Sequence, residues 1–559
     1  MTTHEAAAPR WLYGPAWDLL LGCGGAYLVV FLAIAAFGGG VMRVLPLEVL
    51  PILVLFSGVP HYGATLLRVY ERPSDRRHYA FFSIWASVLV YAVFVLGVYV
   101  ETVGAWMLAI YLIWSPWHYS GQNYGIALML LGRRGVSVPP AAKRWFYASF
   151  GLSWLLVVIS VQGEAPQADY APLDVSQGLY DVVRLGLPAS LQSQLMWGCF
   201  AAYVASVAVF VGLLLRRATL SDLVPAFALI GLQALWFVAP AMSRYAGWFS
   251  GLAPFSDGMA HYVFLWIAMG HSIQYIWVSS YYARGARREH RQGNYLLQIW
   301  LAGGALWGIP LFLFAPDVLG ERGVDGGVAL LVTAAVNLQH FVLDGAIWKL
   351  RDGPVAQVLL GARARADDET IPPRRWLRPL IAFLGLAYAT YVILGALVFQ
   401  FGVVRALDPP DEDKLRQSAQ ILTWLGRDSA SVRHDLGVIS YQNEHYPEAE
   451  AEFRRSLQLA PAARTSINLG LALEAQQQWR PALDAYEEAL VLEPRNVDGL
   501  RNAAKLWVRL GSLGMAEQRI QQALAVVPRQ PDMRQLLRRI RQARGAGVGP
   551  SQAPSSQMR

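Results

Sequence analysis

The sequence predicts an all-α protein: a polytopic bundle of about eleven membrane-spanning helices, followed by a soluble domain of helical repeats. Hydrophobic residues make up 55% of the 559 residues and charged residues only 15%, whereas soluble domains carry roughly 25% charged residues. From Ala406 onward the composition becomes charged and amphipathic, and residues recur at a fixed spacing. We therefore predict a transmembrane domain over 1–405 and a repeat domain over 410–545.

The spans are predicted from the length of the apolar runs. The hydrocarbon core of a bilayer is roughly 30 Å thick, and a helix needs about 20 apolar residues to cross it. Runs of that length cover 17–38, 44–67, 79–100, 104–131, 145–162, 191–215, 220–243, 258–283, 296–316, 326–348 and 378–403.

The orientation is predicted from Lys and Arg, which are concentrated in alternate loops, from 68–77 to 349–378. Such loops stay on the cytoplasmic side. We therefore expect a multi-pass protein of the cell inner membrane, with its N-terminus in the cytoplasm and, after eleven spans, its C-terminal domain in the periplasm. The net charge of +8 follows this topology, so no nucleic-acid partner is expected.

The C-terminal region contains an internal repeat. Four sets of residues recur at steps of 33 and then 34: Leu436-Gly437, Leu469-Gly470 and Ala503-Ala504; Ala449, Ala482 and Ala516; Phe453, Tyr486 and Ile520; Pro461, Pro494 and Pro528. The pattern resembles the tetratricopeptide (TPR) repeat and implies about three repeats plus flanking helices. Stacked repeats commonly bind a protein or peptide partner; a purely structural helical cap is the alternative. The Gly-, Pro-, Ser- and Gln-rich tail, 546–559, is expected to be disordered.

Four histidines within the apolar runs predict a metal site, because ionisable side chains inside spans are rare and usually functional. His61, His118, His271 and His340 lie on runs predicted to point toward the cytoplasm. They precede the next basic residue by 7, 15, 13 and 9 positions, a spread of about 12 Å at 1.5 Å per residue. Tilts and proline kinks can absorb that spread. We expect one layer of imidazoles in the cytoplasmic half, with His261 outside it.

Polar residues that share a helix face with these histidines are expected to support the cofactor. Gln122 follows His118 by four, Asp344 follows His340 by four, and Gln274 follows His271 by three. Each is predicted to hydrogen-bond its imidazole, and Asp344 is alternatively a direct ligand.

Three tyrosines, Tyr62, Tyr119 and Tyr124, are close enough in sequence to donate protons or line a pocket. They are the candidate catalytic residues, although core packing would explain them equally well. Imidazole and oxygen ligands without thiolate suit iron, zinc or copper, and a haem held by two histidines is a further alternative. Non-haem iron is preferred because membrane chemistry on apolar substrates commonly needs activated oxygen. Hydrogen bonding across helices would be the non-metal explanation.

Three short runs carry a resemblance to a known family: Pro60-His61-Tyr62-Gly63, Trp117-His118-Tyr119-Ser120-Gly121-Gln122 and Gly270-His271-Ser272. Scattered over about 60–345, they resemble elements of the bacterial beta-carotene cleavage oxygenase (Brp/Blh) superfamily. That resemblance implies a polytopic fold whose histidines hold non-haem iron. Gln122 or Asn123 stands where the family has an acidic residue, and the chain has extra helices and the repeat tail. We expect iron to carry over but not the carotenoid substrate.

The leading functional hypothesis is a membrane metal-dependent oxidoreductase or oxygenase that acts on a lipid or other apolar substrate entering from the bilayer. A lipid-linked glycosyltransferase or glycan ligase is the second hypothesis. Such enzymes usually need charged residues in outer loops, and the first outer loop, 38–46, has no acidic residue. A non-enzymatic, membrane-anchored TPR scaffold is the third, and it leaves the intramembrane histidines unexplained.

Overall fold

The computed structural model describes residues 10–38, 40, 50–70, 79–163, 183, 185–249, 251–255, 260–286, 292–313, 329–348, 353–360, 377–407 and 409–545. Within these ranges the regular structure is helical, with no β-strand, so the predicted all-α class is confirmed. The chain divides into two compact units, Met1–Gly320 with Gly327–Ala396, and Leu397–Arg559 with Glu321–Gly326. Each unit has hydrophobic clusters of its own.

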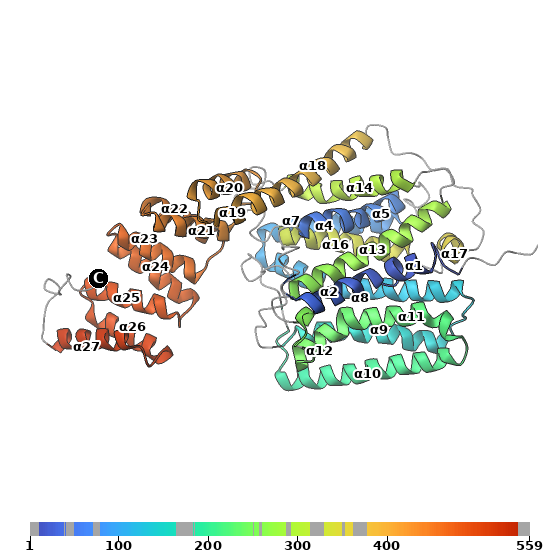
Figure 1. The fold of residues 1–559 in the computed structure, drawn as a ribbon, viewed down its shortest axis with the longest axis horizontal. Helices are drawn as coiled ribbons and strands as arrows, with labels where there is room; N and C mark the ends of the chain where they lie inside the picture. The colour runs from blue at the N-terminus through green and yellow to red at the C-terminus, as the bar shows by residue number, and fades with distance from the viewer. Residues whose placement is uncertain are drawn as a thin grey trace, which may run out of the picture. The chain divides into compact units, whose positions relative to one another are not determined.

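The first unit is a bundle of long helices (Figure 1). In chain order the helices are α1 (Pro15–Trp17), η1 (Asp18–Gly22), α2 (Gly25–Phe37), α4 (Leu50–Ser57), α5 (Val59–Tyr70), η3 (Phe81–Ala86), α7 (Ser87–Tyr99), α8 (Glu101–Arg133), α9 (Pro140–Ser160), α10 (Ala189–Leu215), α11 (Leu220–Gln233), η6 (Ala234–Val238), α12 (Ala239–Ala246), η7 (Ala253–Phe255), α13 (Ala260–Ala286), α14 (Gln292–Leu313), α16 (Ala329–Ile347), α17 (Gly353–Leu360) and α18 (Leu377–Leu397).

Fewer helices qualify as membrane spans than the sequence predicts. Among the described residues, six helices are long and apolar enough to cross a bilayer: Ile52–Tyr70, Phe81–Tyr99, Ala189–Leu215, Leu220–Ala246, Leu330–Ile347 and Leu377–Leu407. A seventh is obtained if Pro15–Gly22 and Gly25–Phe37, which meet at 61°, count as one span. The predicted count of eleven was therefore wrong by this criterion. Run length alone ignored the polar residues within α8 and α13, which are long helices of low mean hydropathy.

The second unit is a stack of short helices (orange to red in Figure 1). Its helices are η10 (Val398–Val403), α19 (Val404–Leu407), α20 (Glu412–Trp424), α21 (Ala430–Gln442), α22 (Tyr446–Leu459), α23 (Ala463–Ala475), α24 (Trp479–Leu492), α25 (Val497–Arg509), α26 (Leu513–Val526) and α27 (Pro531–Gly545). Helices α21 to α26 pack as three consecutive pairs, flanked by α20 and α27. This is a TPR-like arrangement. The tail, 546–559, lies outside the described residues.

The repeat unit begins before the boundary predicted after residue 405. Val403 and Ala406 pack with Leu415 and Ala419 of α20 in one buried cluster. The backbones also approach closely, because a Cβ at Gly402 would overlap the Ser418 side chain. The short helices η10 and α19 are therefore part of the repeat core.

The repeated small residues allow each pair of helices to pack closely. A Cβ added at Gly437 would lie 2.7 Å from the Phe453 ring, and one at Gly470 would overlap the Tyr486 ring. Both rings are buried, with Tyr486 fully enclosed. The recurrence of a small residue with an aromatic one is thus a direct helix–helix contact.

We predict that Gly470→Ala destabilises the repeat unit by about 1–3 kcal/mol, because overpacking a tight contact forces ring or backbone shifts. Hydrogen–deuterium exchange of the full chain in detergent would show faster exchange in α23 and α24. Gly514→Ala is the matched control, because a Cβ there meets nothing within 4 Å. Equal exchange in the two variants would contradict the contact.

A second prediction concerns Glu412, whose carboxylate accepts hydrogen bonds from Ser440 at 2.7 Å, Asn443 at 2.7 Å, Arg416 at 2.8 Å and His445 at 3.0 Å. Burial alone would raise the pKa of Glu412, but these bonds outweigh it and lower the pKa to about 2. The folded pKa lies below the unfolded value of about 4.3. The stabilisation is therefore complete above that pH and is lost as the pH falls toward 2.

Glu412→Gln should accordingly lower the thermal stability of the repeat unit at pH 7, and this deficit should narrow as the pH falls below about 4. Thermal unfolding followed by circular dichroism across that range measures it. The exposed Glu488 provides the control Glu488→Gln, for which no deficit is expected. A Glu412→Gln deficit that is constant with pH would rule out the ionised network.

Candidate metal centre

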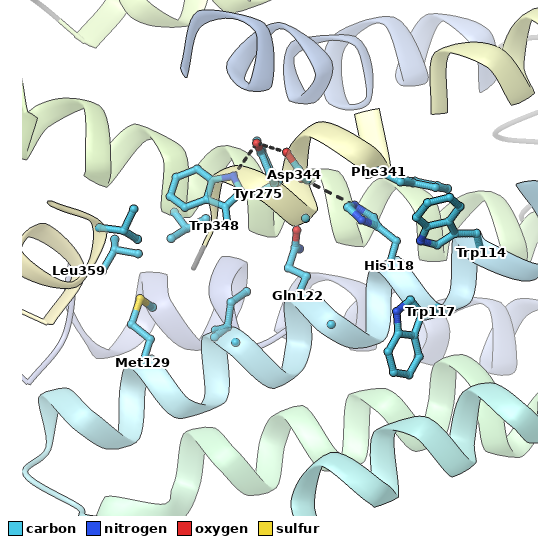
Figure 2. Close-up of a pocket in the computed structure, with 16 residues that line it drawn as sticks. Trp114, Trp117, His118, Gln122, Met129, Tyr275, Phe341, Asp344, Trp348 and Leu359 are labelled. Carbon is cyan, nitrogen blue, oxygen red and sulfur yellow. Dashed lines mark hydrogen bonds and ion pairs between the residues drawn. The ribbon is translucent and has the colours of Figure 1, made fainter. Parts of the chain in front are cut away.

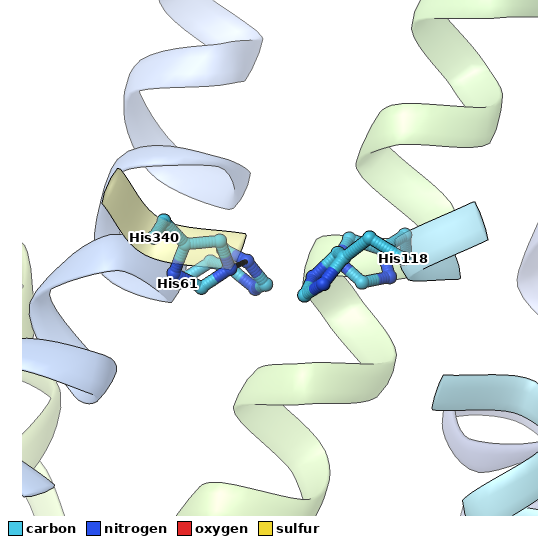
Figure 3. Close-up of side chains that lie close together, drawn as sticks. His61, His118 and His340 are labelled. Carbon is cyan, nitrogen blue, oxygen red and sulfur yellow. Dashed lines mark hydrogen bonds between the residues drawn. The ribbon is translucent and has the colours of Figure 1, made fainter. Parts of the chain in front are cut away.

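The four predicted histidines lie together. His61 is on α5, His118 on α8, His271 on α13 and His340 on α16. One nitrogen from each ring lies within 4.8 Å of a nitrogen from every other ring, and Nε2 of His61 is 2.5 Å from Nε2 of His340. Figure 3 shows the rings of His61 and His340 facing that of His118 across a small gap. The side chain of His261 is outside the part of the structure that is described.

A second layer of polar residues lies one helical turn from the histidines, toward the C-terminal ends of their helices. Each histidine is followed at the fourth position by a polar residue, namely Thr65, Gln122, Tyr275 and Asp344. Thr65 and Tyr275 both bind Asp344, while Gln122 donates to the backbone carbonyl of His271 at 3.0 Å. Contacts in two successive layers require the four helices to run in the same direction as one another. The sequence predicted this shared direction.

The Asp344 carboxylate is oriented by this second layer. Its Oδ1 atom accepts from Thr65 at 2.8 Å and from Tyr275 at 2.7 Å. Trp348 in turn donates to the Tyr275 hydroxyl at 2.7 Å, as Figure 2 shows. The Oδ2 atom is left facing the imidazoles, 3.3 Å from Nε2 of His340 and 3.7 Å from Nε2 of His118.

The same bonds favour one tautomer of His340. Its Nδ1 lies 3.1 Å from the Thr65 hydroxyl, which also lies 2.8 Å from Asp344 Oδ1 and can donate its proton to that carboxylate. With the Thr65 proton on Asp344, His340 Nδ1 carries the ring proton and donates it to Thr65. A neutral ring protonated at Nδ1 has a lone pair at Nε2, so this nitrogen points its lone pair into the cluster.

The donor set fits a metal ion. His61 Nδ1, His118 Nε2 and both ring nitrogens of His271 are buried without a hydrogen-bond partner, and a buried polar atom without a partner is costly. Metal–imidazole bonds of about 2.0–2.1 Å place ligating nitrogens roughly 3–4 Å apart, so small shifts would bring these atoms into place. The ring nitrogens and Asp344 Oδ2 form a nitrogen and oxygen set without a thiolate.

Gln122 and Gln274 do not support the imidazoles as predicted. Gln122 donates to Gln274 at 3.1 Å as well as to the His271 carbonyl. Gln274, which is fully buried, donates to the Gly22 carbonyl at 3.1 Å. The two amides therefore hold η1, α8 and α13 together rather than bonding to ring nitrogens, because spacing along a helix does not determine which neighbour a long side chain reaches.

The three candidate tyrosines have different surroundings. Tyr119 lies with its ring 4.2 Å from that of His271. The Tyr62 ring is 5.0 Å from the His340 ring, but its hydroxyl donates to Asn337 at 2.9 Å. Both border the cluster.

Tyr124 is not brought to the site. Its ring packs against Phe146, Tyr147 and Phe150 of α9, with centroids 5.2, 5.4 and 6.0 Å away. Six residues after His118, at 100° per residue, the side chain leaves α8 on a different face. The catalytic role predicted for Tyr124 is therefore replaced by a packing role.

Sequence reasoning missed Thr65 and Tyr275, which position Asp344 and His340. The signal was present, because each follows a histidine of the cluster by four residues, the same spacing that identified Gln122 and Asp344. Their hydroxyls are also 2.5 Å apart. Applying that spacing to all four histidines would have found the whole second layer.

A close approach of α5 and α14 positions His61. A Cβ at Gly63 would overlap the Ile299 carbonyl, and one at Gly303 would overlap the Val59 carbonyl. Glycines allow helix backbones to come this close inside a bilayer. Because carbonyl groups of a helix cannot rotate away, any side chain at these positions must push α5 off α14.

Comparisons with known proteins bear on the repeats. No family model matches the chain. The tetratricopeptide repeat domain-containing protein PYG7, chloroplastic, from Arabidopsis thaliana is 32% identical over 121 residues, which are 20% of this chain and 40% of that protein. The chain thus matches less than half of that relative's length. This similarity agrees with the TPR-like helix pairs.

Two solved structures are also similar. The type III secretion translocator chaperone SycD of Yersinia enterocolitica is 22% identical, with 23% of this chain and 96% of that chain covered, at a TM-score of 0.19. The APC/C hetero-tetramer Cut9-Hcn1 is 14% identical, with 85% of this chain and 95% of that chain covered, at a TM-score of 0.23. TM-scores this low give no weight to a shared overall fold.

We predict that Gly303→Ala moves α5 away from α14 and withdraws His61 from the cluster, costing about 1–3 kcal/mol of stability and most of the bound metal. Metal analysis of the purified full chain measures the loss. Gly212→Ala on α10 is the control, because its Cβ meets nothing within 4 Å. Full metal retention by Gly303→Ala would show that this helix contact does not position the site.

Proposed function

We propose that this protein is an integral membrane, metal-dependent oxidoreductase that oxidises a lipid or other apolar substrate with dioxygen. The observation that carries the proposal is the group of four histidines, three buried and one half-buried, whose candidate ligating nitrogens lie within 4.8 Å of one another. A single histidine inside a bundle is commonly a hydrogen-bonding residue. Four from separate helices, three of which have ring nitrogens without a hydrogen-bond partner, favour a shared ligand.

Non-haem iron is the proposed ion. Imidazole with carboxylate suits iron, zinc and copper, and the two cysteines, Cys23 and Cys199, are not in the group of histidines. The closeness of the four rings favours a bare ion over a haem, whose macrocycle would have to separate its two axial histidines. Iron in such a site supplies the activation of dioxygen. The resemblance to the Brp/Blh superfamily supports the same choice of metal.

The chain's own residues would hold, orient and shield the ion. Thr65 and Tyr275 would hold the carboxylate of Asp344, and Thr65 would hydrogen-bond Nδ1 of His340. His61, His271 and His340 are at most 2% exposed, so bulk water is kept from these three rings. Tyr119, against the His271 ring, is the nearest of the candidate proton donors to that histidine.

The substrate would reach the metal through a cavity beside His118. The cavity has a volume of about 360 Å³ and a mostly apolar lining that includes Trp114, Phe341 and Met129. An apolar cavity with a few polar groups at one end is typical of small-molecule sites. It suits a substrate that comes from the bilayer.

The apolar outer surface supports a membrane location. Phe81, Trp85 and Leu89, spaced by four residues, are 65%, 67% and 64% exposed. Large exposed apolar surfaces are uncommon on soluble monomers, and lipid would cover this one. The basic loops favour the cell inner membrane with a cytoplasmic N-terminus. The repeats would lie in the periplasm if the bent pair Pro15–Gly22 and Gly25–Phe37 counts as one span, which makes seven crossings.

The TPR-like unit would bind a protein or peptide partner. Its paired helices are the architecture that forms the extended binding surfaces of repeat proteins. The relative PYG7 also carries a tetratricopeptide repeat domain by its name. A partner on this unit would bring the oxidoreductase to a complex or supply it with electrons.

The proposal predicts stoichiometric iron in the purified full chain, measured by plasma mass spectrometry, and substrate-dependent oxygen consumption with membrane lipid extracts. His61→Ala, His118→Ala, His271→Ala and His340→Ala should each lose the metal. Thr65→Val removes the hydroxyl that contacts the proposed ligands His340 and Asp344 but leaves both ligands in place. It should therefore weaken metal affinity about 10–100-fold.

His445→Ala, in the repeat unit, is the control and should keep its metal. If all four cluster variants retain the same metal as His445→Ala, the site assignment is wrong. A metal-free protein that acts on a lipid-linked sugar would favour the glycosyltransferase hypothesis. A metal-free protein without activity would favour the scaffold hypothesis.

A further inference from the structure

The cavity beside His118 follows one face of α8. Its α8 lining consists of residues spaced three or four apart: Trp114, Trp117, His118, Gly121, Gln122, Gly125, Ile126 and Met129. Residues at this spacing form one stripe along a helix. From His118 to Met129 the stripe is about 16 Å long at 1.5 Å per residue, and Figure 2 shows Met129 and Leu359 at the end away from His118. The cavity is therefore elongated.

Glycines keep this cavity open. Gly121 and Gly125 on α8 and Gly345 on α16 all line it, and a Cβ added at any of the three would meet nothing within 4 Å. They differ from Gly63 and Gly303, where a Cβ would overlap backbone. Gly121 and Gly345 are moreover exposed, so the cavity opens at the bundle surface between α8 and α16. The lack of a side chain at these cavity glycines leaves open space, whereas at Gly63 and Gly303 it allows two helices to touch.

The polarity of the lining changes along its length. Polar groups gather near His118, namely Gln122, Tyr275 and Asp344, and they already bind one another or neighbouring helices. The far end is formed by Ile126, Met129, Val278, Val355 and Leu359, which offer no group to a polar ligand. A ligand that fills the cavity must be apolar along most of its length.

We propose that the cavity takes one acyl chain of a bilayer lipid, which enters between Gly121 and Gly345 and lies along α8 between His118 and Met129. The 16 Å stripe is close to half the bilayer's hydrocarbon thickness, about 15 Å, which one acyl chain spans. A chain in this position passes within reach of His118 and Asp344. The inference rests on the proposed function for the oxidation of that chain, but its binding can be tested separately.

Photolabelling tests the binding. The full chain is reconstituted in phosphatidylcholine vesicles that contain a small fraction of phosphatidylcholine with a diazirine within one acyl chain. After irradiation, mass spectrometry should find label on the peptides of α8 and α17 that carry Met129 and Leu359. Gly125→Leu and Gly345→Leu fill the cavity and should lose that label. Gly212→Leu, at an equally open and exposed glycine of α10, should keep it.

Metal content separates this inference from the proposed function. Gly125→Leu should lose the label and keep its iron, whereas His118→Ala should lose the iron and keep the label. Leucine is a better helix former than glycine, and gel filtration checks that the variants remain folded. The inference would be overturned if Gly125→Leu and Gly345→Leu were labelled as strongly as the wild-type protein. It would also be overturned if the label were found only on outward-facing residues such as Trp85 and Leu89. Label in the cavity of a metal-free protein would support it while removing the proposed oxidation.

Discussion

Four imidazoles buried side by side are the constraint on which the bundle depends. A neutral imidazole has one donor and one acceptor, and each buried polar atom left without a partner costs about 1–3 kcal/mol. His61, His118 and His271 together carry four such nitrogens. Hydrophobic residues of similar size would avoid this cost, so the arrangement makes physical sense if a ligand common to the rings satisfies one nitrogen of each ring.

The surrounding structure brings the rings together and holds them. The backbone contact of α5 with α14 through Gly63 and Gly303 fixes the position of His61. One turn away, Thr65 and Tyr275 aim Asp344 at the same point. The closely packed and hydrogen-bonded parts of the bundle are thus next to the histidines, while the space that the glycines leave open lies along α8, where a substrate would move.

The sequence predicted the four histidines because ionisable side chains are conspicuous within apolar runs. It predicted the depth of these histidines in the membrane less reliably. The estimated spread of about 12 Å used the next basic residue as a marker of the membrane surface, yet Arg133 on α8 is 5% exposed and donates to the Leu359 carbonyl inside the bundle. A basic residue that is buried in this way does not mark the surface.

The rest of the structure could be predicted from the sequence only partly. The TPR-like repeats were clear, because a 33- to 34-residue period places a small residue against an aromatic ring in successive pairs. The sequence did not predict the partners of Gln122 and Gln274 or the packing of Tyr124. These contacts depend on how α8, α9 and α13 face each other. The cavity could not be predicted at all, because it arises from missing side chains on separate helices.

X-ray absorption at the iron edge of the purified full chain tests the central claim most directly. Ligation by the histidines predicts a first shell of nitrogen and oxygen at about 2.0–2.2 Å, with the multiple scattering of several imidazole rings. A shell that contains sulfur, or an oxygen shell without imidazole scattering, would contradict the proposal that these four helices meet around a metal ion.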